Sequence, residues 1–162
     1  MAVLADRREY AARRNAPPHR TSPLRYHAHM EDANTEPSSL YQVIGGADKI
    51  RELVDRFYDL MELEPEFAGI RALHPQDTSG SREKLFMFLS GWTGGPDLFI
   101  ERYGHPRLRA RHLPFAIGTG ERDQWLRAMA WAMEDVGIDE GLRLRLMESF
   151  FGTADWMRNK AD

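Results

Sequence analysis

The chain has 162 residues, 42% hydrophobic and 29% charged, which is enough for one soluble domain with its own core. A formal net charge of −3 gives no general attraction to nucleic acid or to an anionic membrane. The absence of cysteine excludes disulfides, thiolate metal sites and cysteine nucleophiles. No apolar run is long enough for a membrane helix or a secretory signal, so we expect a cytoplasmic protein.

The first 37 residues differ in composition from the rest of the chain. They contain four prolines and few large aliphatic residues, and up to His29 they carry six arginines against two acidic residues. Such a segment cannot bury enough apolar surface to offset the entropy lost on ordering. We predict a disordered N-terminal extension over residues 1–37 and a folded domain over residues 38–162. The alternatives are a functional basic tail and a natural start at Met30.

Apolar residues at helical spacing predict helices along the first half of the domain. A short helix is expected over residues 39–44, before Gly45, and a longer one over residues 50–61, before Pro65. Pro75 lies in a sequence typical of a loop. Ser79 or Ser81 can cap the helix that follows. One face of that helix carries Ser81, Leu85, Phe88 and Trp92.

The second half of the domain is divided by prolines and glycines. Between Pro106 and Pro114 only residues 107–113 can be helical, which allows at most two turns. A long helix is expected over residues 121–136, and Asp139 can cap a last helix that runs to about Met157. No segment alternates apolar and polar residues with period two, so the predicted fold class is all-α.

Three histidines lie in the domain: His74, His105 and His112. A histidine in a helical domain is usually an ordinary surface or core residue. His112 differs because it lies near the end of a short helix bounded by prolines. Arginines precede it and apolar residues follow it. Such a mixture suits an axial haem ligand, which needs an imidazole for the iron, apolar walls for the macrocycle and cations for the propionates.

The run from Gly104 to Phe115, GHPRLRARHLPF, resembles the proximal segment of group II truncated haemoglobins. The resemblance covers about residues 39–160. It includes residues 41–46, the DRFY sequence at 55–58, the GGP stretch at 94–96 and the start of the helix near residue 121. It implies a truncated globin domain over residues 38–162, with a two-over-two helical sandwich around one haem b.

The resemblance also implies roles for individual residues. His112 would bind the iron, and its other ring nitrogen should donate to a backbone carbonyl. Tyr58 and Trp125 fall on distal positions where they would donate hydrogen bonds to oxygen; an indole can only donate. Judged without the resemblance, both are ordinary core aromatics.

The remaining distal positions carry His74, Ser81 and Leu85. His74 would face the ligand and either hydrogen-bond to it or coordinate the resting iron, so the iron is expected to be penta-coordinate or weakly hexa-coordinate. The alternative interpretation of His74 is a loop histidine exposed to solvent. Ser81 would leave an open route for ligands, and Leu85 would be an apolar lid over them.

Six further residues are implied as haem contacts. Lys84 and Arg111 would pair with the propionates, although ordinary solvated charge is nearly as good an interpretation of each. The expected apolar walls of the haem pocket are Phe57, Phe88, Phe115 and Met129.

Three functions are consistent with these residues. The first is tight binding of oxygen, and of carbon monoxide and nitric oxide. The second is a haem enzyme for nitric oxide dioxygenation or peroxidase-like chemistry, which would need a separate reductase because the sequence has no glycine-rich flavin or nicotinamide motif. The third is a helical sensor or interaction module without functional haem. We expect a monomer or homodimer with no nucleic-acid or membrane partner.

Overall fold

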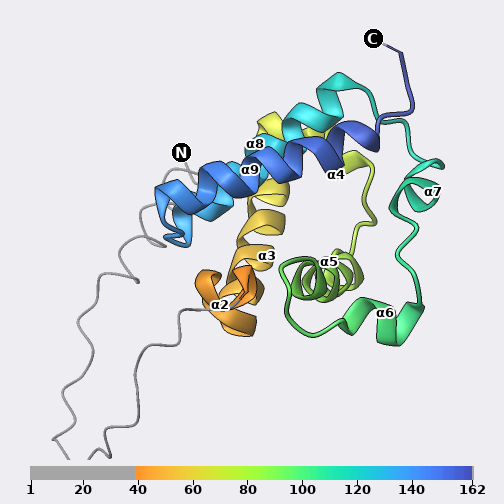
Figure 1. Cartoon of the computed structure of the whole chain (residues 1–162). Helices are drawn as coiled ribbons and strands as arrows, with labels where there is room; N and C mark the ends of the chain where they lie inside the picture. The colour runs from red at the N-terminus through yellow and green to blue at the C-terminus, as the bar shows by residue number, and fades with distance from the viewer. Residues whose placement is uncertain (1–38, 162) are drawn as a thin grey trace, which may run out of the picture. The chain divides into compact units, whose positions relative to one another are not determined.

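The computed structural model describes residues 39–161, which form helices joined by short loops (Figure 1). This part of the chain contains no strand, which confirms the all-α prediction. Residues 1–38 and 162 lie outside the described range, so the extension predicted over residues 1–37 and the boundary at residue 38 stay predictions. None of the helices in residues 39–161 combines the length and apolarity needed to cross a bilayer.

The first two helices meet at a pair of glycines. Helix α2 spans Leu40–Ile44, and the Ser39 hydroxyl accepts a hydrogen bond from the Gln42 N–H (3.3 Å) as its N-cap. Gly45 and Gly46 have φ angles of 120° and 74°, which side-chain-bearing residues rarely adopt. Helix α3, Gly46–Leu63, therefore starts in a new direction directly after α2.

Two short elements occupy the stretch from Pro65 onward, for which the sequence pattern predicted no element. The 3₁₀-helix η1 spans Pro65–Phe67 and helix α4 spans Ala68–Ala72. Phe67 and Ile70 are buried and anchor the segment. The Gln124 side chain accepts a hydrogen bond from the Ile70 N–H (3.0 Å). Elements of this length show no readable apolar period, which is why the sequence pattern did not reveal them.

Helix α5, Ser79–Trp92, differs from its prediction at its N-terminal cap. Neither Ser79 nor Ser81 caps it: the cap position is Thr78, which makes no capping hydrogen bond through its side chain. The most buried residues are Phe86, Met87, Leu89 and Ser90, whereas the predicted face is only half-buried. The predicted face therefore remains partly accessible.

The second half of the domain contains four helices. Helix α6 spans Leu98–Tyr103, α7 spans Leu108–His112, α8 spans Thr119–Asp135 and α9 spans Glu140–Trp156. Helix α7 lies within the short segment allowed by the two prolines, as predicted. The Asp139 carboxylate accepts a hydrogen bond from the Leu142 N–H (3.3 Å) and so caps α9, also as predicted.

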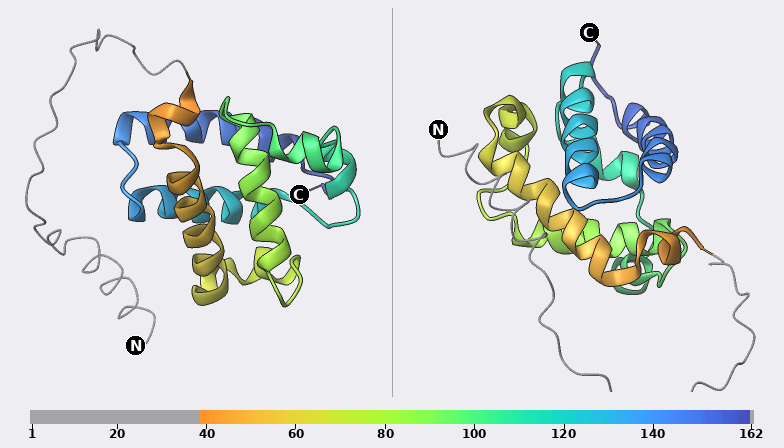
Figure 2. Two further views of the ribbon diagram at one scale, coloured as in Figure 1. Left: turned by 90° about the horizontal axis from the view of Figure 1, so that it is seen from below. Right: turned by 90° about the vertical axis from the view of Figure 1, so that its left-hand side faces the viewer.

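Helices α3 and α5 form one layer and cross helices α8 and α9, which form the other (Figure 2, left). The core between the layers contains Phe57 from α3 and Met129 and Met133 from α8, all without exposed surface. A buried ion pair from Arg56 to Asp135 (2.9 Å) joins α3 to α8. This is the two-over-two arrangement that the resemblance implied.

We expect removal of residues 1–30 to leave the thermal stability of the domain nearly unchanged. The reason is that this segment lacks the apolar periodicity of a helix that packs on a core. Thermal unfolding of the full and shortened chains checks this. A fall in Tm of more than about 5 °C, corresponding to roughly 1 kcal/mol or more, would show that the segment is structural.

Asp139→Ala should lower the free energy of unfolding by about 1 kcal/mol, because it removes the side-chain acceptor at the start of α9. In a domain of this size the corresponding fall in Tm is about 3–5 °C. Asp139→Asn, which keeps an acceptor oxygen, serves as the matched control and should cost less. Equal Tm values for Asp139→Ala and the parent chain would show that the cap contributes nothing.

Candidate functional site

His112 is the last residue of helix α7, and its ring is fixed to that helix. Its Nδ1 lies 2.6 Å from the Leu108 carbonyl oxygen, one turn earlier. A carbonyl only accepts hydrogen bonds, so Nδ1 carries the proton, and Nε2 of the neutral ring has a free lone pair. The expected carbonyl partner is therefore present, and Nε2 is the ring nitrogen that remains to bind a metal.

The neighbouring histidine, His105, lies in the turn before α7 and makes a hydrogen bond within it. Arg107 has φ 45° and ψ 49°, the left-handed conformation, and it is the only residue other than glycine with positive φ among residues 39–161. The Arg107 N–H donates to the His105 Nδ1 (3.1 Å). His105 is exposed and holds this turn, so it has a local role that does not require a metal.

A second imidazole, that of His74, lies just beyond the end of α4 and has the same arrangement. Its Nδ1 donates to the Ile70 carbonyl (2.8 Å). Burial is the largest cause that lowers the pKa of His74; the charges of Arg71 and His112 lower it further, and the bond to Ile70 opposes them. The His74 Nε2 is therefore a hydrogen-bond acceptor or a metal ligand at neutral pH, and not a donor.

Tyr58 on α3 lies against His74. The two rings meet edge to face with centroids 5.6 Å apart, and Ser81 lies near enough to the Tyr58 hydroxyl to affect its pKa. Burial raises the pKa of Tyr58 well above its ordinary value, although Arg82 and Ser81 act in the opposite direction. The phenol therefore stays protonated at neutral pH and can donate a hydrogen bond.

Trp125 on α8 joins the same aromatic group through Phe57. The Phe57 ring lies 5.3 Å from the Trp125 ring and 5.1 Å from the Tyr58 ring. Trp125 also contacts Phe150 of α9 (5.5 Å). Within residues 39–161 its indole N–H has no hydrogen-bond acceptor, which leaves that donor available to a ligand.

The residues expected to contact a haem fall into three sets. Ser81, Leu85 and Phe88 lie on the half-buried face of α5. Lys84 and Arg111 are exposed; their charged ends approach the rings of Tyr103 (5.9 Å) and Phe99 (5.4 Å), and neither pairs with a carboxylate within the described residues. Phe115 is exposed, whereas Phe57 and Met129 have no exposed surface. The predicted contact of these residues with a macrocycle stays a prediction.

The residues present fit a haem better than a metal held by side chains alone. No group of three or more His, Asp and Glu residues in the described range could hold a bare ion. The structure instead provides two imidazoles with free Nε2 atoms, placed closely enough for their charges to interact. It adds Lys84 and Arg111, which have no carboxylate partner within the described residues, and partly accessible apolar side chains, which suit the propionates and ring of a haem.

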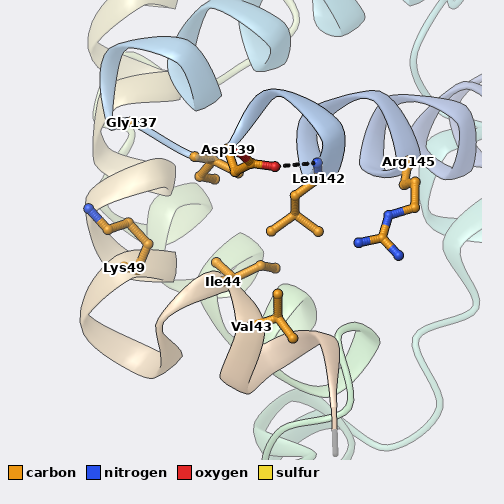
Figure 3. Close-up of a pocket in the computed structure, with 8 residues that line it drawn as sticks. Val43, Ile44, Lys49, Gly137, Asp139, Leu142 and Arg145 are labelled. Atoms are coloured by element: carbon orange, nitrogen blue, oxygen red, sulfur yellow. Dashed lines mark hydrogen bonds between the residues drawn. The ribbon is translucent and has the colours of Figure 1, made fainter. Parts of the chain in front are cut away.

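A surface pocket of about 410 Å³ lies elsewhere, between α2, the start of α3 and the start of α9 (Figure 3). Val43, Ile44 and Leu142 form its apolar part, and Lys49 and Arg145 stand at its sides. None of the predicted site residues lines it. It is therefore separate from the two imidazoles.

Sequence reasoning missed the backbone contributors to this site. The carbonyls of Ile70 and Leu108 fix the two imidazoles, and each is four residues before its histidine. The spacing of one helical turn was a usable signal, but a carbonyl is present whatever the side chain is, so no residue type marks it. The Arg109 and Asn159 contacts described below were also missed.

The crossing of α3 and α5 over α8 and α9 is that of a two-over-two globin, and comparison with known proteins agrees. The family model for the bacterial-like globin matches residues 39–159. The "Group 2 truncated hemoglobin YjbI" of Bacillus subtilis is 37% identical over 122 residues, which are 75% of this chain and 89% of that protein.

Solved structures show the same similarity. A "Group II 2-on-2 Hemoglobin" from Agrobacterium tumefaciens has 41% identity and a TM-score of 0.76, covering 79% of this chain and 99% of that one. A cold-adapted truncated hemoglobin from Pseudoalteromonas haloplanktis TAC125 has 37% identity and a TM-score of 0.74, covering 76% and 100%. The chain belongs to the bacterial-like globin family and, within it, to the group II truncated haemoglobins, a family that implies haem iron.

Proposed function

We propose that this globin holds one haem b without a covalent bond, with His112 as the protein ligand to the iron, and that it binds oxygen reversibly. The observation that carries the proposal is the His112 ring, whose Nδ1 is fixed to Leu108 and whose Nε2 is free. Haem supplies the iron that binds oxygen and the related gases carbon monoxide and nitric oxide. A cysteine-free chain cannot attach the macrocycle through thioether bonds.

The protein's own groups would hold the cofactor by charge and apolar contact. Lys84 and Arg111 have no carboxylate partner within the described residues, so each can pair with a propionate. Leu85, Phe88 and Phe115 present partly accessible apolar surface for the ring. Burial of that surface on cofactor binding would contribute through the hydrophobic effect.

Tyr58 and Trp125 are the proposed distal donors. The Tyr58 phenol stays protonated because burial raises its pKa, and Ser81 can orient it. The Trp125 indole N–H has no acceptor within the described residues. Oxygen held in the pocket carries partial negative charge, so both donors would slow its release. Strong retention favours oxygen capture or slow release over rapid exchange.

We propose a different part for His74. Because its proton sits on the Nδ1 that faces Ile70, the neutral ring offers only a lone pair at Nε2. That lone pair can accept a hydrogen bond or supply a weak sixth ligand to the iron, but it cannot donate to oxygen. The proposed coordination is accordingly five ligands, or six with His74 weakly bound.

Replacing His74 with phenylalanine should change the oxygen dissociation rate by less than about threefold, which is under 0.7 kcal/mol. The reason is that no donor to oxygen is lost. Stopped-flow displacement of oxygen measures the rate, and Tyr58→Phe, which does lose a donor, is the comparison. An acceleration as large as that of Tyr58→Phe would show that His74 donates to oxygen.

A peroxidase-like activity is the second candidate function, and the same His74 tautomer favours it. The free Nε2 can take up the proton that hydrogen peroxide releases, which is the task of a general base. Reaction of the ferric protein with hydrogen peroxide tests this candidate, because His74→Phe would then react more slowly than the parent chain. Turnover in this role, or in nitric oxide dioxygenation, requires a separate reductase.

A further inference from the structure

Helix α7 has little packing of its own to hold it in place. It has only five residues, and none of them is buried. It begins at the left-handed Arg107, a conformation that costs energy for any residue other than glycine. Some other part of the chain must therefore fix the direction in which the His112 ring points.

The tail that follows α9 supplies that attachment, and Figure 1 shows it beside the segment that contains α7. The Asn159 side-chain amide makes three hydrogen bonds there. Its Nδ2 donates to the carbonyls of His112 (3.1 Å) and Phe115 (2.7 Å), and its Oδ1 accepts from the Ile117 N–H (3.0 Å). The Asn159 N–H also donates to the Ile117 carbonyl (2.9 Å).

Arg109 on α7 makes a second attachment in the opposite direction. Its guanidinium donates to the carbonyl of Trp156 and to that of Arg158 (3.1 Å), at the end of α9. Helix α7 and the tail are thus joined by a side chain from each segment, Arg109 and Asn159. Two of the joined carbonyls, those of His112 and Trp156, belong to the last residues of α7 and α9.

We propose that Asn159 is the positioning residue for His112, an inference that rests on the proposed role of His112 as the iron ligand. The His112 ring is fixed to its helix through Leu108, and the helix is fixed to the tail through Asn159. The direction of Nε2 therefore depends on a residue 47 positions along the chain that touches no ligand. Partners of this kind orient metal ligands and tune the metal bond.

An asparagine is required because the position needs donors and an acceptor on one planar group. Aspartate has the same shape and keeps the acceptor toward the Ile117 N–H, but it loses both donors. It also places a negative charge against two carbonyl oxygens. Asn159→Asp is therefore the sharpest single change for testing the attachment.

The test compares the ferrous haem-loaded full chain with Asn159→Asp by resonance Raman spectroscopy. The iron–histidine stretching band should shift or broaden in Asn159→Asp, and haem transfer to an acceptor protein should become at least about fivefold faster, since two hydrogen bonds are lost. Asp139→Ala is the matched control: it weakens the other end of α9 and should lower Tm while leaving the band and the transfer rate unchanged.

A second comparison shows whether the effect passes through His112. In a His112→Gly chain supplied with imidazole, the ligand is no longer joined to α7, so adding Asn159→Asp should not change the iron–imidazole band. An unchanged band in Asn159→Asp alone, or an equal change in the imidazole-supplied chain, would overturn the inference. If Asn159→Asp is too unstable to load with haem, Asn159→Ala, which removes the same side-chain bonds without adding a charge, is measured in its place and judged by the same two outcomes. If instead the proposed role of His112 as iron ligand is wrong, His112→Gly keeps its haem without added imidazole, which distinguishes that failure from failure of the inference about Asn159.

Discussion

Replacing His112 with alanine should abolish stable haem binding. Within residues 39–161 the other half-buried imidazole whose Nδ1 faces a carbonyl is that of His74, and the proposal gives it at most a weak bond to the iron. Losing the main ligand removes the metal–nitrogen bond that holds the cofactor in the chain. The measurement is the haem-to-protein ratio after gel filtration, together with the ferrous absorption spectrum.

His105→Ala is the matched control for that change. His105 precedes the same helix, but its Nδ1 already accepts from the Arg107 N–H, so its removal should leave the haem-to-protein ratio at that of the parent chain. Full haem content and an unchanged ferrous spectrum in His112→Ala would show that the iron ligand is another residue.

Trp125→Phe should speed oxygen dissociation by at least about tenfold, the equivalent of 1.4 kcal/mol. A hydrogen bond to a charged or strongly polarised acceptor contributes roughly 1.5–3 kcal/mol, and phenylalanine cannot make one. Carbon monoxide carries little negative charge, so its dissociation rate should change much less. Stopped-flow measurements of both gases separate loss of a hydrogen bond from a change in pocket volume.

Tyr58→Phe should act in the same direction. Tyr58 and Trp125 both contact Phe57. If the two residues donate to one ligand, the effect of the double variant on the oxygen dissociation rate should differ from the sum of the two single effects, expressed as free energies. Trp131→Phe, on the same helix but packed against Phe67, is the control and should leave both gases unaffected. Equal effects of Trp125→Phe on oxygen and carbon monoxide would mean that the residue only packs.

The long helices could be predicted because apolar spacing and helix-ending residues agree there. Pro106 and Pro114 restricted α7 to a short segment, and Asp139 stood where a cap was needed. The expected partner of the His112 ring was also found, at the Leu108 carbonyl. In each case a local rule of backbone chemistry was sufficient.

The rest depended on tertiary contacts that local rules do not describe. Helix α4 is held by the buried Ile70 and by Gln124 from a distant helix, so no local period marks it. The sequence pattern placed Leu85 and Phe88 on one face of α5, but it did not show that the adjacent face, which carries Phe86 and Leu89, is the more buried one. Asn159 lies after the last helix and gave no signal, because its partners are backbone groups more than 40 residues away.

The central claim, that this chain is a haem protein with a histidine ligand, is tested most directly by titrating the purified full chain with ferric haem and recording the ferrous carbonyl spectrum. We expect saturation at one haem per chain and the sharp carbonyl band of a histidine-ligated haem, with all haem extractable into acidified organic solvent. Unsaturable binding, or a carbonyl spectrum identical to that of free haem, would contradict it.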